Sequence, residues 1–227
     1  MLHLLEEVMR KLIIIFCITV LFAADDKAPS QRTRDREVDI HHIKIVVTVD
    51  IESESVYGHV IHKLSPFGSS LESFSLDAED MTIRRVRLNG KDISFDHNGD
   101  KVHLVMNKPI GWEDTVKVRL DYTAHPRRGT FFIKPDSIYP DKPWQAWTQG
   151  EDTDNHHWVP IYDYPNDKAT FETILTVDKK FKAISNGELL SVNNNKNGTH
   201  TWHWKENYPM VAYLISYVVG EFEKVED

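Results

Sequence analysis

Residues 43–51 have the sequence Ile-Lys-Ile-Val-Val-Thr-Val-Asp-Ile (IKIVVTVDI), in which apolar side chains occupy every second position. Successive side chains of an extended strand point to opposite faces, so this period predicts a strand with one buried face. Residues 116–122 (VKVRLDY) alternate in the same way. No segment after residue 24 shows a convincing helical period, and the sequence therefore predicts an all-β protein.

Seven further segments have strand-like composition, and four Asn-Gly pairs punctuate the chain. The segments are residues 56–64, 70–76, 82–88, 102–106, 170–177, 199–205 and 212–222. The pairs are Asn89-Gly90, Asn98-Gly99, Asn186-Gly187 and Asn197-Gly198. Both residues of such a pair tolerate positive φ, which a tight hairpin requires. We therefore expect antiparallel sheets joined by short hairpins.

Composition and charge exclude one class of partner. The chain has 227 residues, of which 41% are hydrophobic and 27% charged, with a formal net charge of -8. These values are ordinary for a soluble globular protein large enough to bury a core. A nucleic-acid-binding surface needs clustered Lys and Arg, and no basic block of that size occurs. We expect no nucleic-acid partner.

The N-terminus resembles a secretory signal peptide. The run Leu12–Ala24 is apolar apart from one threonine, and Arg10 and Lys11 precede it. Because a membrane-spanning helix needs roughly 20 apolar residues, this run is short for an anchor. We assign residues 1–24 to a signal peptide and propose Met9 as an alternative start of translation. Export to the periplasm or the extracellular space follows, without a stable membrane anchor after cleavage; an uncleaved anchor is the alternative.

The rest of the chain divides into three parts. Residues 25–39 are polar and charged and are expected to form a flexible leader. Residues 40–223 form the predicted β domain, and residues 224–227 begin a linker. The only cysteine, Cys17, lies in the signal segment, so the mature chain has no disulfide. Within the domain, residues 126–165 are rich in Pro, Trp, Tyr and Asp, and a loop region of this length is often functional.

Few residues offer chemistry of their own. A His-Glu-x-x-His zinc motif and a Gly-rich phosphate loop are both absent from the sequence. The pair His156-His157 lies near several aspartates, which allows a metal site, but adjacent residues of a strand point to opposite faces. Surface polarity is therefore the favoured interpretation for this pair, and likewise for His41-His42 at the start of a strand.

Two other features have both a functional and a structural interpretation. Five aromatic residues of the long loop region could form a stacking platform for peptides or sugars, although packing of the loop onto the sheet is favoured. They are Trp144, Trp147, Trp158, Tyr162 and Tyr164. The triplet Asn197-Gly198-Thr199 fits a glycosylation acceptor, but a bare hairpin turn is the favoured explanation.

The segment Trp147–Phe171 (WTQGEDTDNHHWVPIYDYPNDKATF) resembles the N-terminal domain signature of the M1 family of zinc aminopeptidases, in the form found in bacterial secreted members. That signature contains Thr-Gln-x-Glu, an aromatic-Pro-x-aromatic-Asp-x-Pro stretch and an Ala-Thr-Phe strand. Three further blocks are similar to the family and occur in the same order. They are Arg128–Ile133, Ala183–Gly187 and Tyr208–Glu223.

The resemblance implies a saddle-shaped, many-stranded antiparallel domain that precedes a thermolysin-like catalytic domain. In the family, the Gln and Glu of Thr-Gln-x-Glu reach into the active-site cleft, and these positions are Gln149 and Glu151 here. The resemblance assigns Glu151 to the free α-amino group of a peptide and Gln149 to its first residue. It assigns the zinc to the catalytic domain, so this chain binds none and is expected to be inactive alone.

Departures from the family pattern mark the limits of the resemblance. His156 and His157 stand where members often carry Arg, Ile161 replaces a frequent Cys, and Thr130 replaces a Leu. The motifs of the catalytic domain do not occur, so we interpret the chain as a fragment of a longer enzyme. The alternative is a secreted, non-catalytic β-sandwich that binds peptides or glycans, or that serves as a scaffold.

Overall fold

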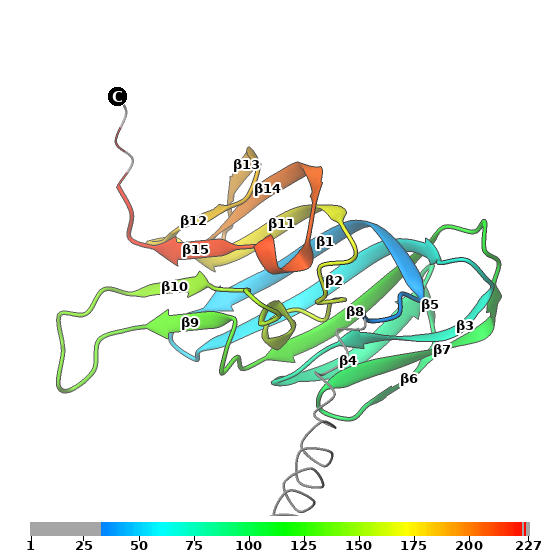
Figure 1. The fold of residues 1–227 in the computed structure, drawn as a ribbon. Helices are drawn as coiled ribbons and strands as arrows, with labels where there is room; N and C mark the ends of the chain where they lie inside the picture. The colour runs from blue at the N-terminus through cyan, green and yellow to red at the C-terminus, as the bar shows by residue number, and fades with distance from the viewer. Residues whose placement is uncertain (1–32, 224, 226–227) are drawn as a thin grey trace, which may run out of the picture. The chain divides into compact units, whose positions relative to one another are not determined.

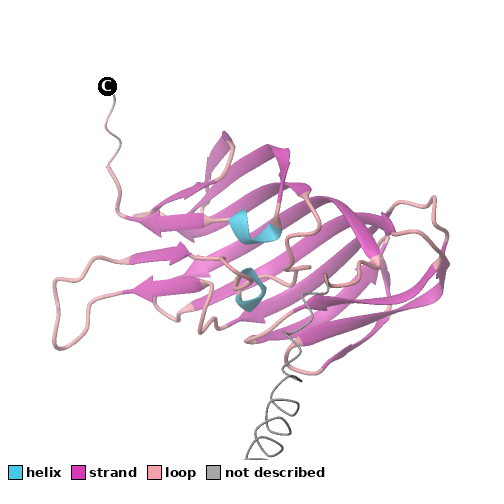
Figure 2. Ribbon diagram, in the orientation of Figure 1, coloured by secondary structure: helices cyan, strands magenta, loops and turns pink. Residues whose placement is uncertain are grey.

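A computed structural model describes residues 33–223 and residue 225, and strands dominate this part of the chain (Figure 2). The strands, in chain order, are β1 (Val38–Asp50), β2 (Ser55–Pro66), β3 (Leu71–Asp77), β4 (Met81–Leu88), β5 (Lys91–Asp92), β6 (Ser94–His97), β7 (Lys101–Ile110), β8 (Val116–Ala124), β9 (Thr130–Ile133), β10 (Gln145–Thr148), β11 (Ala169–Asp178), β12 (Lys182–Ser185), β13 (Glu188–Asn194), β14 (Thr199–Met210) and β15 (Tyr217–Gly220). Two single-turn 3-10 helices, η2 (Asn155–His157) and η3 (Ala212–Leu214), interrupt them. The all-β prediction is confirmed.

The largest sheet has eight strands in the order β13-β14-β11-β1-β2-β8-β4-β5 (Figure 1). Every neighbouring pair is antiparallel except β1 and β11, which run parallel in register from His42–Thr170 to Thr48–Thr176. The expectation of purely antiparallel pairing was therefore wrong at one position. Hairpin signals report only strands adjacent in sequence, and β1 and β11 are separated by more than a hundred residues.

Two smaller sheets complete the domain. One contains β12-β15-β10-β9 and the other contains β3-β7-β6. Strand β12 contacts β11 and β14 of the large sheet, while β6 and β7 contact β4. The strands that carry the long loop region, β9 and β10, thus belong to the four-stranded sheet (Figure 1).

A single apolar core connects the three sheets. On β1 the residues at alternate positions are buried, with Ile43, Ile45, Val47 and Val49 each at most 3% exposed. Burying one such side chain stabilises the fold by about 1.5–3 kcal/mol. The predicted period of two is therefore confirmed where it was clearest.

The Asn-Gly pairs divide into hairpins and a crossover. Asn89 and Gly90 have positive φ values of 48° and 84° and connect the paired strands β4 and β5. Gly187 also has positive φ, yet the strands on either side of it do not pair with each other. Strand β12 pairs with β15, and β13 pairs with β14, so the predicted hairpin at residues 186–187 is instead a crossover between two sheets.

The start of the domain differs from the sequence prediction. Strand β1 begins at Val38, which is 2% exposed, and Arg36 donates a hydrogen bond from Nη1 to the carbonyl of Asn166 at 3.0 Å. The end of the predicted leader is thus packed against the domain. The predicted signal peptide and most of the leader lie outside the described residues. Within the described part, no helix has the length and apolar character needed to cross a membrane.

Residues 212–222 do not form the continuous strand that was predicted. Helix η3 occupies the start of this segment, and β15 begins only at Tyr217. The side chain of Asn155 donates hydrogen bonds to the carbonyls of Ala212 and Ile215, at 2.7 and 2.9 Å. These two carbonyls are therefore satisfied without a strand partner, which permits the turn.

Candidate functional site

The long loop region contains more structure than the sequence indicated. Strands β9 and β10 pair antiparallel, with Trp147 opposite Phe131 and Thr148 opposite Thr130. Six residues separate the end of β10 from the start of helix η2. The candidate residues Gln149 and Glu151 therefore lie directly beyond the end of a paired strand and not within a free loop.

Side chains alternate through the tetrapeptide that follows Trp147. Thr148 faces the sheet, where its hydroxyl accepts a hydrogen bond from the Tyr217 amide at 2.9 Å. Gly150 is buried, whereas Gln149 and Glu151 are exposed. The strand-like alternation continues past β10, so the two candidate side chains share the solvent-facing side.

Gly150 is held by close packing against Asn155. A Cβ atom at residue 150 would lie 2.6 Å from the side-chain amide of Asn155 and 2.5 Å from the carbonyl of Tyr213. The Asp154 amide donates to the Gly150 carbonyl at 2.9 Å. Asn155 is itself fully buried, and its Oδ1 accepts a hydrogen bond from Trp158 Nε1 at 2.8 Å. Residue 150 must be glycine because any side chain would displace this network.

A second close approach fixes the backbone on the other side of the tetrapeptide. The Gln149 amide donates to the Gly129 carbonyl at 3.0 Å. Gly129 has a φ of +71°, and a Cβ there would lie 1.9 Å from the Asp154 carbonyl. The backbone between the two candidate side chains is thus held from both sides, while their polar ends remain in solvent.

Glu151 has no partner of its own in the described part of the chain. Its carboxylate makes no hydrogen bond or ion pair with any described residue, and neither does the Gln149 amide group. A carboxylate that is buried in a salt bridge would be unavailable to a ligand. The exposed position leaves the Glu151 carboxylate open to a ligand from solvent.

Most aromatic residues of the region serve packing. Trp158 is fully buried and meets the Tyr217 ring edge-on at 5.1 Å, and Tyr162 is 5% exposed. Trp144 and Tyr164 are partly buried against the core. Among the five aromatic residues considered from the sequence, Trp147 is the exception, because it is 36% exposed and stacks on Phe131 at 4.6 Å. A continuous stacking platform of five rings therefore does not form.

The histidine pair is arranged differently from the sequence prediction. His156 and His157 lie on helix η2 and their rings stack at 4.5 Å, so they do not point to opposite faces. His157 is 4% exposed, which also excludes simple surface polarity for that residue. Burial by itself would lower the pKa of His156, but the hydrogen bond and charge of Asp163, with Asp77 and Glu79, raise it above its usual value.

The sequence indicated nearby aspartates, and two of them, Asp154 and Asp163, do contact the rings. It did not indicate the residues that come from the other side of the pair. Glu79 and Asp80 contact the two imidazoles, although they lie 77 residues away in the chain. The role of Asn155 was also not predicted, because its hydrogen bonds to Ala212 and Ile215 arise only from tertiary packing.

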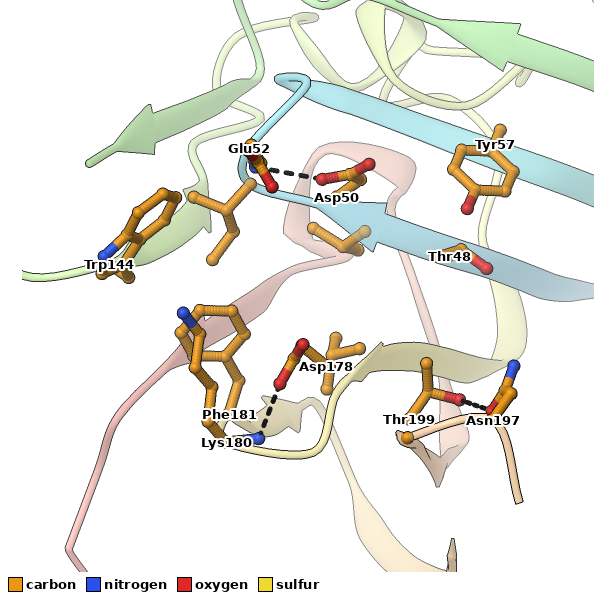
Figure 3. A pocket seen from close by; sticks show the side chains of 14 residues that line it. Thr48, Asp50, Glu52, Tyr57, Trp144, Asp178, Lys180, Phe181, Asn197 and Thr199 are labelled. Carbon is orange, nitrogen blue, oxygen red and sulfur yellow. Dashed lines mark hydrogen bonds between the residues drawn. The ribbon is translucent and has the colours of Figure 1, made fainter. Parts of the chain in front are cut away.

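A pocket with a volume of about 430 Å³ lies elsewhere, at the ends of β1 and β11. Figure 3 shows Asp50 and Glu52 on one wall and Asp178 with Lys180 on the other. The Lys180 ammonium lies 4.6 Å from the centre of the Trp144 ring. Neither Gln149 nor Glu151 lines this pocket, and its lining residues provide no histidine or cysteine.

Comparison with known proteins identifies the relatives of this domain. Leukotriene A-4 hydrolase of Xenopus laevis is 25% identical over 207 residues, which cover 86% of this chain and 34% of that protein. Leucyl aminopeptidase of Saccharolobus solfataricus is 28% identical over 159 residues, covering 70% and 19%. The chain thus spans about a third or less of these relatives.

A solved structure has the same fold. An M1 zinc metallopeptidase of Deinococcus radiodurans, bound to a Tyr-Ser-Ala substrate, superimposes with a TM-score of 0.71 at 22% identity, covering 82% of this chain and 43% of that one. The family model for the peptidase M1 N-terminal domain matches residues 39–214. This chain therefore belongs to the M1 peptidase N-terminal domain family.

Proposed function

We propose that this domain binds the free amino end of a peptide and presents it to the catalytic domain of a zinc aminopeptidase. Glu151 pairs with the α-ammonium group of the peptide, and Gln149 contacts the first residue. The single observation that carries the proposal is the exposure of both side chains on a backbone that is fixed from both sides.

The chemistry of the ligand favours this assignment. A terminal ammonium is a compact cation with three donors, and a carboxylate without an internal partner is free to accept from it. A rigid backbone keeps the carboxylate at one distance from any neighbouring catalytic group. Fixing the amine in this way limits cleavage to the first peptide bond, which is the outcome expected of an aminopeptidase.

Zinc chemistry is assigned to a different part of the enzyme. The sequence of these 227 residues has no His-Glu-x-x-His motif, so they do not fit the zinc site of a thermolysin-like catalytic domain. No bond-breaking step is therefore placed on this chain, and the catalytic domain is proposed as its partner. Export of the enzyme to the periplasm or the extracellular space is part of the same proposal.

The test uses the enzyme reconstituted with the polypeptide that the gene encodes after codon 227. An in-frame His-Glu-x-x-His within about a hundred codons is expected from the domain order of the family. With an aminoacyl-arylamide substrate, Glu151→Gln should lower kcat/KM because one charge-assisted contact to the substrate is lost. The loss corresponds to about 2–4 kcal/mol of binding free energy. Asp152→Asn, which removes the neighbouring exposed carboxylate, is the matched control and should leave kcat/KM nearly unchanged.

Three results would contradict the proposal. The first is equal loss of activity in the Glu151 and Asp152 variants, which would indicate a general effect of negative charge. The second is chelator-sensitive turnover by the purified 227-residue chain alone. The third is a stop codon with no downstream catalytic motif, which would favour a secreted binding or scaffold module.

A further inference from the structure

The turn between β3 and β4 meets helix η2 at a cluster of metal-ligand side chains. Glu79 lies in this turn, and its amide donates a hydrogen bond to the His156 carbonyl at 3.0 Å. The backbones of the two segments are therefore tied together next to the imidazole rings of His156 and His157. We call Glu79, His156 and His157 the His156 cluster.

The ligand atoms of the His156 cluster converge. The Nε2 atoms of His156 and His157 lie 3.6 and 4.0 Å from the same Glu79 oxygen, Oε2. All three ligand atoms lie within 4.8 Å of one another. Tetrahedral zinc with bonds of about 2.0–2.1 Å places its ligand atoms about 3.3 Å apart. Small side-chain movements therefore suffice to close the cluster around one ion.

The opposite nitrogen of each ring is held by a carboxylate. His156 Nδ1 lies 3.1 Å from Asp163 Oδ2, and His157 Nδ1 lies 2.8 Å from Asp80 Oδ2. The side chains of these two aspartates are only 1% and 6% exposed. A proton on each Nδ1 then leaves the Nε2 lone pairs directed toward Glu79. Carboxylate–histidine pairs of this kind orient the imidazoles of protein metal sites.

The local charge is mixed, because Arg127 pairs with Asp80 at 2.6 Å and lines the access pocket together with Arg128. Carboxylates are nevertheless the more numerous charged groups around the two rings. Asp163 Oδ1 is buried and accepts no hydrogen bond in the described part of the chain, while Oδ2 accepts from the His156 amide and lies beside His156 Nδ1. Asp154 Oδ1 lies 3.9 Å from His157 Nε2 and offers a carboxylate for a fourth position. Arg127 contacts the other Glu79 oxygen, Oε1, at 3.5 Å and leaves Oε2 to the histidines.

We propose that Glu79, His156 and His157 form a binding site for a divalent transition metal of the zinc class. Two imidazoles and one carboxylate suit Zn²⁺, Co²⁺, Ni²⁺ or Cu²⁺, whereas Ca²⁺ and Mg²⁺ prefer oxygen ligands throughout. A pocket of about 340 Å³ that Glu79 and His157 both line gives the ion access from solvent.

The bound ion links helix η2 to the turn between β3 and β4. Helix η2 follows Gln149 and Glu151 within six residues, and the β3–β4 turn belongs to a different sheet region. Metal binding therefore fastens the segment after β10 to the turn at residues 78–80. This inference goes beyond the proposed peptide-docking role and is tested separately from it.

The experiment titrates the metal-free 227-residue chain with Co²⁺ and with Zn²⁺. The expected result is one tight site, with the visible absorption bands of Co²⁺ in a low-coordinate nitrogen and oxygen environment. Zn²⁺ should also raise the temperature of unfolding, because an ion that binds only the folded state stabilises it. Twelve histidines give a background of weak binding, so variants must locate the site.

Glu79→Gln is the decisive variant because it removes the ligand charge with little change of shape at a partly exposed position. It should weaken the tight site by at least the roughly 10–100-fold that loss of an outer-sphere partner costs. His156→Gln should do the same. Glu172→Gln is the matched control. Glu172 also contacts two histidines, His42 and His203, but the ligand atoms of these three side chains do not all lie close to one another.

Circular dichroism of each metal-free variant checks that it is folded. Loss of the tight site in folded Glu79→Gln, with full retention in Glu172→Gln, supports the proposal. An unchanged tight site in Glu79→Gln overturns it, since the ion must then bind elsewhere. The absence of any tight site in the wild-type chain overturns it as well, as does equal weakening in both variants.

Discussion

Two parts of one segment behave in opposite ways. The tip (residues 149–152) exposes Gln149 and Glu151 and gives their side chains no partner among the described residues. The base (residues 155–163) buries Asn155, Trp158 and Asp163 in a network of hydrogen bonds and ring contacts. Only a few residues separate the two parts.

The difference separates stability from binding. Burial and satisfied hydrogen bonds in the base hold the backbone, whereas the exposed groups of the tip add little to the free energy of unfolding. A site that must meet a ligand needs both properties side by side, with a rigid support and a free polar end. Substitutions in the two parts should therefore have different consequences.

The largest expected effect comes from the base. Trp158→Ala removes a fully buried ring and leaves Asn155 Oδ1 without its donor, and it should lower the free energy of unfolding by about 3–5 kcal/mol. Trp147→Ala is the matched control, since that ring is 36% exposed and loses mainly its stacking on Phe131. Urea unfolding measures both. Similar losses in the two variants would break the distinction between buried and exposed aromatic residues.

The second effect depends on pH and involves His62 of β2, whose ring contacts the Pro160 carbonyl of the base at 2.9 Å. Burial lowers the pKa of His62 from 6.5 to about 4, and the hydrogen bond to Pro160 only partly opposes this. The unfolded chain then binds a proton at a higher pH than the folded chain does. This contribution to stability is present above pH 6.5 and is lost as the pH falls toward 4.

A shift of this size corresponds to about 3 kcal/mol between the two ends of the window. The free energy of unfolding, measured at pH 7 and pH 4.5, should therefore fall less in His62→Gln than in the wild-type chain. His125→Gln alters an exposed ring and serves as the control. An identical fall in the wild-type and His62→Gln proteins would show that burial does not lower the pKa of His62 in the folded state.

The smallest expected effect is at the tip. Glu151→Gln should change the free energy of unfolding by no more than about 0.5 kcal/mol, because its carboxylate has no partner among the described residues. Asp163→Asn is the contrasting variant in the base, where the carboxylate accepts from the His156 amide at 3.0 Å. It should cost about 1–3 kcal/mol. A large loss in Glu151→Gln would show that the tip contributes to folding.

The sequence predicted those elements whose signal is local. Alternation predicted β1 and β8, because a strand with one buried face has apolar residues at every second position. The Asn-Gly pair predicted the β4–β5 turn, because both residues tolerate positive φ. The parallel pairing of β1 with β11 and the sheet crossover at Gly187 were missed. Both depend on strands that are distant in sequence, for which neighbouring residues carry no signal.

The candidate site shows the same division. The Thr-Gln-Gly-Glu stretch could be selected from the sequence through its resemblance to a family, and Gln149 and Glu151 remain predictions as ligands of a peptide. Two partners of His156 and His157, the residues Glu79 and Asp80, could not be selected, because they approach the rings only through the folding of β3 and β4 against η2. The prediction that the two rings point apart was wrong for the same reason, since a 3-10 turn replaced the assumed strand.

By itself, the sequence determined that this chain is a β protein, because alternating burial and turn residues are visible in neighbouring positions. The resemblance of its motifs to the M1 N-terminal domain could also be recognised from the sequence. Only the tertiary structure decided which polar groups are free and which are enclosed. Glu151 and Asp163 are both acidic residues of one segment, and apart from the family resemblance no local pattern of polarity predicts that one is exposed and the other buried. The packing of Asn155 and η2 against distant strands leaves one carboxylate in water and buries the other.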